Sequence, residues 1–179
     1  MKTACPSNTY AKTVCVAGIA REACAGKDDP KALELYAGAG NFTVLLARTL
    51  PRHIVAVESS PEACEAARMN LAARGLQANA KVVEADAATF AVPAGTHLVV
   101  LDPPRKGARE VATTLAASRV NHVVYVSCDP QTLARDLSLL ATAFTLRSVE
   151  LFELFPQTSH VESVLHLSRA PRAPHGSAS

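Results

Sequence analysis

The chain has 179 residues, of which 49% are hydrophobic and 19% are charged. This length can bury one sizeable core but is short for two domains, and the composition excludes a disordered or fibrous protein. The net charge of +2 is too small to indicate nucleic-acid binding by itself, because such binding neutralises several phosphates at once. No segment approaches the length of a membrane span, so we expect a soluble protein without a membrane partner. The sequence leaves the oligomeric state open, with a monomer as the default.

The five cysteines indicate reduced thiols rather than a disulfide framework. Their number is odd, and no two of them have the CxxC spacing of a zinc or redox site. We therefore predict no metal ligands and a cytoplasmic location. The cysteines are Cys5, Cys15, Cys24, Cys64 and Cys128.

Residues 1–30 predict a helical extension ahead of the main domain. The apolar run at 14–20 resembles the core of a signal peptide, but it has only about half the usual length and follows a polar stretch. A helix that packs on the domain is the preferred interpretation.

From residue 31 onward, short apolar runs alternate with helical patterns. This alternation is typical of βαβ units and predicts an α/β fold with a mostly parallel sheet. The five strands expected first are 32–36, 53–57, 81–84, 98–101 and 123–126, and helices are expected over about 42–50, 61–74, 110–117 and from 130 onward.

The pattern changes after Phe144. Two strands, 146–154 and 161–167, are joined by a short loop without a helix, so they should be antiparallel. We assign the main domain to 31–168. The tail at 169–179 is rich in Pro, Ala, Ser and Gly and has too little apolar surface to fold, which predicts disorder.

Polar residues and glycines follow the ends of all five of the first strands. In an open parallel sheet the ligand crevice lies outside the carboxyl ends of the strands, so these residues should converge there. A purely structural chain has no need of such a set, and we predict a functional site. The residues are the Gly38/Gly40 turn, Glu58, Asp86, Asp102 and Cys128.

The glycine turn and Glu58 indicate a cofactor that carries a nucleoside. Gly38 and Gly40 allow close backbone approach, and Glu58 lies 20 residues after Gly38, where a carboxylate can accept two ribose hydroxyls. NAD is the alternative, but its fingerprint needs a third glycine where this chain has Thr43. S-adenosylmethionine has no pyrophosphate and does not need that glycine.

Two neighbouring features each allow two interpretations. Asp86 can hold an adenine amino group or cap a helix. The stiff loop Asp102-Pro103-Pro104-Arg105 can position a carboxylate and form a pocket wall, or it is a turn with a proline stop. The basic residues that follow can bind phosphates or form an ordinary solvated helix start; they are Arg105, Lys106 and Arg109.

Cys128 is the cysteine best placed to act as a nucleophile. It lies between an apolar strand and a helix that begins at Asp129-Pro130, where amide dipoles can stabilise a thiolate. Buried cysteines are common in cores, and Cys64, on the inner face of its helix, is an example of that structural alternative.

Four segments together resemble the RNA (uracil-5-)methyltransferases in order and spacing. The resemblance covers about 31–167, and its last two segments are the specific ones, because many methyltransferases share the glycine-rich turn. The segments are Leu33-Glu34-Leu35-Tyr36-Ala37-Gly38-Ala39-Gly40-Asn41-Phe42, Asp102-Pro103-Pro104-Arg105, Ser127-Cys128-Asp129-Pro130 and His160-Val161-Glu162-Ser163.

The resemblance implies a Rossmann-like class I S-adenosylmethionine-dependent methyltransferase with tRNA or rRNA as substrate. It implies that Cys128 is the nucleophile that adds to uracil C6, and that Glu162 is the base that removes the C5 proton. In this fold family the last strand is antiparallel and lies beside the fifth, which would bring these two residues together. The positions that match cofactor-binding residues are Tyr36, Asn41, Glu58 and Asp102.

The sequence departs from the family ahead of this domain. Family members carry an RNA-binding region there, whereas this chain has about 30 residues in which the family's Phe-x-Gln segment is not recognisable. We therefore expect the N-terminal RNA-binding region to be lacking. The spacing of the first three cysteines predicts no iron–sulfur cluster. The alternative to an active methyltransferase is a truncated S-adenosylmethionine-binding module without independent activity.

Overall fold

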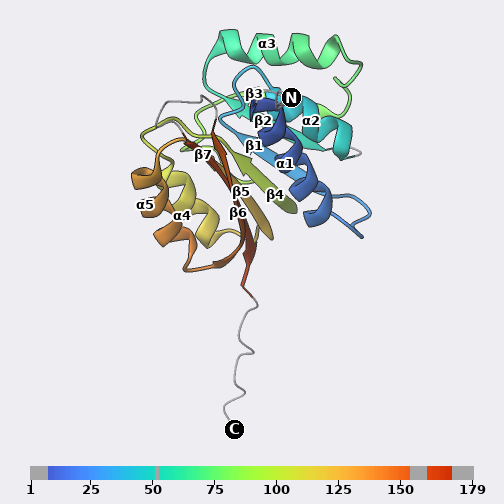
Figure 1. The fold of residues 1–179 in the computed structure, drawn as a ribbon. Coiled ribbons are helices and arrows are strands. Elements are labelled where there is room, and N and C mark those ends of the chain that lie inside the picture. The colour runs from blue at the N-terminus through green and yellow to red at the C-terminus, as the bar shows by residue number, and fades with distance from the viewer. Residues whose placement is uncertain (1–7, 51–52, 154–160, 171–179) are drawn as a thin grey trace, which may run out of the picture.

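The computed structural model describes residues 8–50, 53–153 and 161–170. They form a seven-stranded sheet in the order β3-β2-β1-β4-β5-β7-β6 (Figure 1). Strands β1 to β5 are parallel, and β7 runs antiparallel between β5 and β6. The strands are β1 (Lys31–Leu35), β2 (Ile54–Glu58), β3 (Ala80–Glu84), β4 (Thr96–Leu101), β5 (His122–Ser127), β6 (Phe144–Glu153) and β7 (Val161–Arg169).

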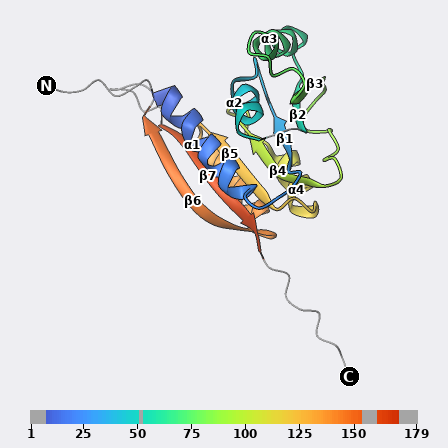
Figure 2. The ribbon, with the colours of Figure 1, turned by 90° about the vertical axis from the view of Figure 1, so that its right-hand side faces the viewer.

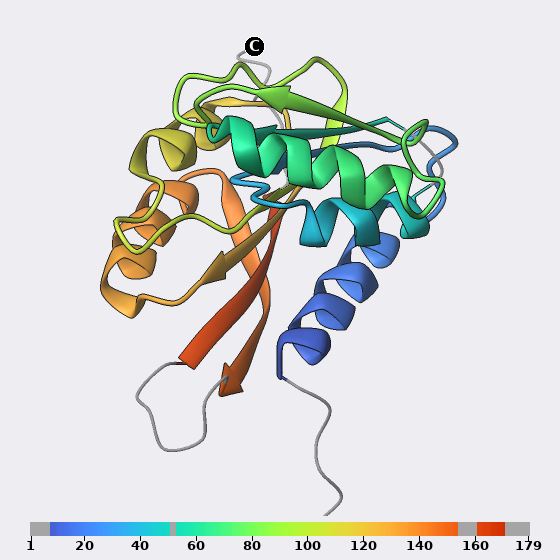
Figure 3. The ribbon, with the colours of Figure 1, turned by 90° about the horizontal axis from the view of Figure 1, so that it is seen from above.

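Helices cover both faces of the sheet and give a three-layer α/β arrangement (Figures 2 and 3). Apolar side chains of α1, α2 and α3 form one core with the first face, and those of α4 and α5 form a second core with the other face. In the ranges described, every helix is too short or too polar to cross a lipid bilayer. The helices are α1 (Asn8–Ala23), α2 (Asn41–Thr49), α3 (Pro61–Ala72), α4 (Arg109–Ala117) and α5 (Pro130–Leu140).

Helix α1 forms part of the domain itself. Val16, Ile19, Ala20 and Ala23 recur at helical spacing, are buried, and share a core with α2 and the sheet. The helix expected within the first 30 residues therefore exists, and its buried face makes it one of the packing layers.

The strand ends differ from the expected ones by one or two residues. β1 ends at Leu35 because Tyr36 has a positive φ of 62°, which no strand residue adopts. β7 continues to Arg169, whose Nε donates to the Val120 carbonyl at 2.6 Å. Residue 169, expected to be the first of the tail, therefore belongs to β7. Residues 154–160, expected to form a loop, and 171–179 lie outside the described residues.

The pairing of β5 with β7 decides which strand ends meet. The two strands are antiparallel, with Tyr125 opposite Leu165 and Ser127 opposite Ser163. The expected antiparallel neighbour of the fifth strand is confirmed. Cys128 directly follows Ser127 and Glu162 directly precedes Ser163, so residues 34 positions apart come to the same edge of the sheet.

Candidate active site

The glycine turn after β1 has the backbone that its sequence requires. Gly38 and Gly40 have φ of 53° and 81°, a region that side chains with a Cβ rarely adopt. A Cβ on Gly40 would lie 3.0 Å from Ala67 Cβ of α3, whereas a Cβ on Gly38 would meet nothing within 4 Å. Gly40 thus allows close packing of two helices, and Gly38 leaves open space at the strand end.

The Glu58 carboxylate fixes this turn to the end of β2. One oxygen accepts the Gly38 N–H at 2.9 Å, and the other accepts the amides of Ser59 at 2.8 Å and Ser60 at 2.9 Å. Burial acts to raise the pKa of Glu58, but these hydrogen bonds outweigh it and the pKa lies below its ordinary value. The group is a carboxylate with acceptor capacity left on the Gly38 side.

Tyr36 is the shared wall of three cavities at this edge. The cavities have volumes of about 160, 240 and 440 Å³. Gly38, Asn41 and Asp102 also line the smallest, whereas Glu58, Asp86 and Asp102 line the largest. Burial, reinforced by nearby carboxylates, raises the pKa of Tyr36 to about 12, so its hydroxyl stays protonated. Except for Gly40, the expected cofactor residues thus line these cavities.

Asp86 caps a turn and also faces the cavities. Its Oδ1 accepts the Ala88 N–H at 2.9 Å, but a turn follows and no α-helix begins there. The side chain is exposed and lines the two larger cavities together with Tyr36. The expected helix cap is therefore not found; Asp86 caps a turn instead, and its exposed carboxylate remains accessible to a ligand.

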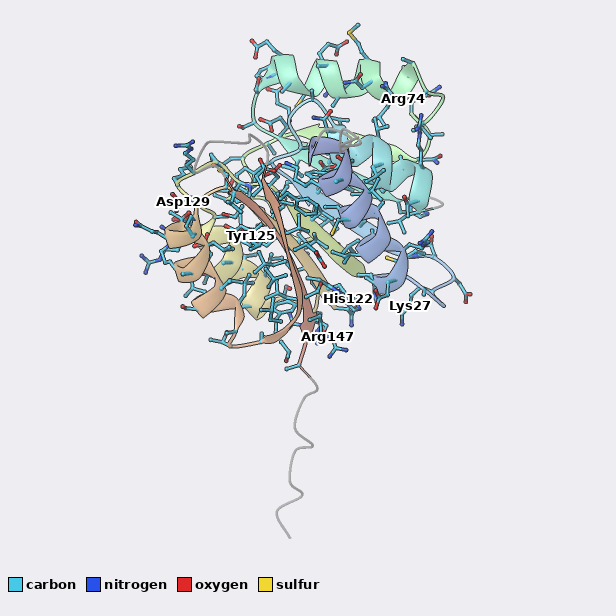
Figure 4. The ribbon with its side chains drawn as sticks, in the orientation of Figure 1. Lys27, Arg74, His122, Tyr125, Asp129 and Arg147 are labelled. Carbon is cyan, nitrogen blue, oxygen red and sulfur yellow. The ribbon has the colours of Figure 1, made fainter. Side chains whose placement is uncertain are left out.

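Cys128 is a free, half-buried thiol directly before α5. Asp129, the N-cap, accepts the amides of Gln131 at 3.0 Å and Thr132 at 2.9 Å. These first amides are therefore not available to the sulfur, and the helix acts on Cys128 only through its dipole. Figure 4 labels His122 and Tyr125 of β5 and Asp129, the N-cap of α5. Cys128 lies in the chain between the last residue of β5, Ser127, and Asp129.

Glu162 has a partner that the sequence reasoning missed. Lys12 Nζ of α1 lies 2.5 Å from Glu162 Oε2 and 3.7 Å from Asp102 Oδ2. Lys12 also lines the smallest cavity, whereas Cys128 and Glu162 line none of the three cavities above. The sequence did contain an indication that Lys12 is buried, because it lies four residues before Val16, at the start of the buried face of α1. A lysine at such a position needs a partner.

Glu34 is a second missed residue and lies beneath the site. It is 2% exposed and accepts a hydrogen bond from the Thr43 hydroxyl at 2.6 Å. Thr43 is the residue that stands where the NAD fingerprint has its third glycine. Burial raises the pKa of Glu34 from 4.5 to about 8, against the lowering effect of the Thr43 hydrogen bond, and Asp102 adds to the rise. The residue is therefore neutral at pH 7.

Glu34→Gln should make the free energy of unfolding less sensitive to a rise in pH between 4.5 and about 8. The folded chain keeps a proton on Glu34 that the unfolded chain loses between pH 4.5 and about 8, so the free energy of unfolding falls as pH rises through this window. Gln cannot ionise, so its advantage should grow from near zero at pH 4.5 to at most about 5 kcal/mol above pH 8. Urea unfolding across this range measures it, with exposed Glu84→Gln as the control; equal pH slopes for both variants would contradict the prediction.

Helix α5 holds the loop between β4 and α4 in place. The Asp136 carboxylate is fully buried and accepts the Ala108 N–H at 2.6 Å and the Tyr125 hydroxyl at 2.7 Å. Thr132 donates to the Arg105 carbonyl and Arg135 to the Lys106 carbonyl, both at 3.0 Å. A Cβ on Gly107 would lie 2.7 Å from Asp136 Oδ2, so only glycine fits. The loop that carries Asp102 is thus rigid.

Asp136→Ala should destabilise the protein by about 3 kcal/mol. The change leaves a buried amide and a buried hydroxyl without an acceptor and removes the partner of Arg135. Denaturant unfolding measures the loss, with exposed Ser138→Ala of the same helix expected within about 0.5 kcal/mol of the parent. A loss below 1 kcal/mol would mean that the loop is held by other contacts.

The basic residues Arg105, Lys106 and Arg109 are exposed at the same edge. Lys106 and Arg109 line the 240 Å³ cavity together with Tyr36. The positive charges of these side chains are therefore exposed to solvent and lie beside the polar cavities, where a phosphate could reach them.

Comparison with known proteins first identifies the class of the fold. Residues 32–102 match a methyltransferase domain family, and residues 95–170 match the tRNA (Uracil-5-)-methyltransferase family. The N-methyltransferase NodS of Bradyrhizobium japonicum superposes with a TM-score of 0.73 at 14% identity, covering 92% of this chain and 88% of NodS. The fold is that of the class I S-adenosylmethionine-dependent methyltransferases, as expected.

More similar proteins narrow the class to one family. The tRNA (uracil-54, C5)-methyltransferase of Pyrococcus abyssi has a TM-score of 0.74 at 30% identity, over 87% of this chain and 38% of its own. The 23S rRNA (uracil(1939)-C(5))-methyltransferases RlmD of Pseudomonas fluorescens Pf0-1 and Stenotrophomonas maltophilia R551-3 are 40% and 41% identical over 76% of this chain. The chain belongs to the RNA (uracil-5-)methyltransferase family and corresponds to its catalytic domain. It spans 30% and 32% of the length of those two relatives.

Proposed function

We propose that this chain is a catalytic domain that methylates C5 of a uridine in tRNA or rRNA, with S-adenosylmethionine as methyl donor and Cys128 as covalent nucleophile. The observation that carries the proposal is the β5–β7 register, which ends with Ser127 opposite Ser163. It brings the free thiol of Cys128 and the carboxylate of Glu162, whose side chain has low exposure, to the edge that holds the glycine turn. The named activities of the relatives support the same reaction.

The cavities have the size and the donor set for the cofactor. The cavity of about 440 Å³ falls in the range of small-molecule sites, and the cavity of about 160 Å³ shares Tyr36 and Asp102 with it. Glu58 has acceptor capacity for the ribose hydroxyls, and exposed Asp86 is available to the adenine amino group. The open backbone at Gly38, with Asn41 and Asp102, would hold the methionine end. When bound, the cofactor supplies an electrophilic methyl group.

The two reactive residues divide a difficult substitution into easier steps. Uracil C5 is a poor nucleophile until the Cys128 thiolate adds to C6, which leaves the ring as an enolate with its charge on C5 and O4. C5 would then be nucleophilic enough to accept the methyl group that a bound S-adenosylmethionine would supply, with S-adenosylhomocysteine as the leaving group. Glu162 takes the C5 proton, and the electron pair of that C–H bond expels the Cys128 thiolate and restores the ring.

The substrate must reach this edge as an extruded base. Taking a uridine out of its stack costs a few kcal/mol, which contacts to the flanking nucleotides repay. Exposed Arg105, Lys106 and Arg109 are suited to bind the flanking phosphates, whereas the rigid Asp102-Pro103-Pro104 loop forms a wall beside them.

Two measurements test the proposal. Isothermal titration with S-adenosylhomocysteine should give saturable binding that weakens at least about tenfold in Glu58→Ala; absence of binding would overturn the cofactor assignment. Radiolabelled methyl transfer to transcribed 23S rRNA and to a tRNA pool, with nucleoside mass spectrometry, should yield 5-methyluridine. Binding without any transfer would favour the alternative of a cofactor-binding module inactive alone, since the chain spans about a third of its relatives.

A further inference from the structure

Lys12 brings a positive charge from α1 into the candidate active site. Its side chain is only 10% exposed, and its ammonium lies 2.5 Å from Glu162 Oε2 and 3.7 Å from Asp102 Oδ2. The same nitrogen lies 5.5 Å from the centre of the Phe42 ring, within range of a cation–π contact. A buried ammonium is costly unless it is paired, so this arrangement fixes where the lysine can be.

The ammonium joins two carboxylates that would otherwise repel each other. Burial raises the pKa of Asp102, Lys12 acts to lower it, and the charge on Glu162 raises it further. Glu162 is 17% exposed at its side chain, and within the described residues its Oε2 has the Lys12 ion pair but no directed hydrogen bond. Oε2 is buried, so Lys12 is the contact that can fix the orientation of the carboxylate through this oxygen, while Oε1 is the oxygen left to accept a proton.

We propose that Lys12 is a positioning residue that holds the Glu162 carboxylate in place for removal of the C5 proton. This inference rests on the proposed function, because it assigns Glu162 the role of the base. It implies that α1 contributes to one step of the reaction: loss of the Lys12 charge should slow proton removal and release of the RNA, and should leave addition of Cys128 and methyl transfer nearly unchanged.

5-Fluorouridine separates these steps. Its C5 carries fluorine, which a base cannot remove as a proton, so the covalent complex stops after methyl transfer. The rate of adduct formation on RNA containing 5-fluorouridine therefore reports the steps before Glu162 acts, whereas multiple turnover on ordinary uridine RNA includes the last step. The ratio of the two rates isolates the role of Lys12.

The experiment compares Lys12→Met, which keeps the length and apolar stem, with Lys12→Arg, which keeps the charge. Exposed Lys27→Met is the matched control. With S-adenosylmethionine at saturating concentration, because Lys12 also lines a cavity assigned to the cofactor, we expect Lys12→Met to form the 5-fluorouridine adduct within about threefold of the parent rate. We expect it to turn over uridine RNA at least about tenfold more slowly and to accumulate the covalent complex. Lys12→Arg should recover most of the turnover, and Lys27→Met should match the parent.

Each other outcome overturns the inference in a recognisable way. Equal loss of adduct formation and turnover in Lys12→Met would mean that Lys12 is structural, and unchanged turnover would mean that it has no role. If the parent chain binds S-adenosylhomocysteine but forms no adduct, the proposed function fails and the role of Lys12 fails with it.

Melting temperatures test the ion pair between Lys12 and Glu162 without RNA. Lys12→Met and Glu162→Gln combined should lower the melting temperature by less than the sum of the single changes. Additive changes would contradict the ion pair.

Discussion

Cys128→Ala is expected to lose at least about 1,000-fold of the methyl-transfer rate, because the substitution removes the group that makes uracil C5 nucleophilic. Binding of S-adenosylhomocysteine should stay within about twofold, since Cys128 lines none of the cavities assigned to the cofactor. Single-turnover transfer from radiolabelled S-adenosylmethionine to the RNA that the parent methylates measures the first quantity, and calorimetry measures the second.

The matched control is Cys15→Ala, which removes another free, half-buried thiol. Burial and the nearby Glu150 raise the pKa of Cys15, so it is a poor nucleophile. We expect this variant to keep the parent rate. A Cys128→Ala protein that retains more than a tenth of the activity would show that the reaction proceeds without a covalent step through this residue.

Glu162→Gln should reduce turnover on uridine RNA by about 100- to 10,000-fold, the range found for loss of a general base. The amide cannot take the C5 proton, so the methylated RNA should remain attached to Cys128 and appear as a band that survives denaturing electrophoresis. The variant also leaves Lys12 with Asp102 as its remaining carboxylate partner at 3.7 Å among the described residues, and the melting temperature should fall.

Exposed Glu150→Gln on the neighbouring strand β6 is the control for Glu162→Gln. It removes a carboxylate from the same sheet and should change neither turnover nor the amount of covalent complex. Rapid release of product RNA by Glu162→Gln would mean that another group removes the proton.

The fold was predictable from the sequence because its signals are local. Strands β4 and β5 contain the continuous apolar runs 98–101 and 123–126. Ser60-Pro61 and Asp129-Pro130 begin α3 and α5 as their capping residues predict. The differences between the predicted and the observed strands were confined to the strand ends, where a single residue can leave the extended conformation, as Tyr36 does with its positive φ. The placement of Cys128 and Glu162 at the same edge of the sheet depended on the strand order, which the family resemblance supplied and periodicity alone did not.

The interactions around the site were less predictable because they join residues far apart in sequence. Lys12 meets Glu162 across 150 positions, and Asp136 meets Ala108 across 28. Glu34 looks like an ordinary strand residue, and its neutrality follows from burial beneath the glycine turn and from the hydrogen bond to Thr43. No local pattern encodes such contacts; the buried stripe of α1 was the one sequence feature that indicated Lys12.

The most direct test of the proposed chemistry is a covalent trap. The full chain is incubated with S-adenosylmethionine and RNA transcribed with 5-fluorouridine, the denaturation-resistant complex is digested, and the modified peptide is sequenced by mass spectrometry. The proposed mechanism predicts a methylated 5-fluorouridine attached to Cys128, and no complex with Cys128→Ala. A chain that transfers methyl groups to uridine C5 in ordinary RNA yet forms no such adduct, or forms it at another residue, would contradict it.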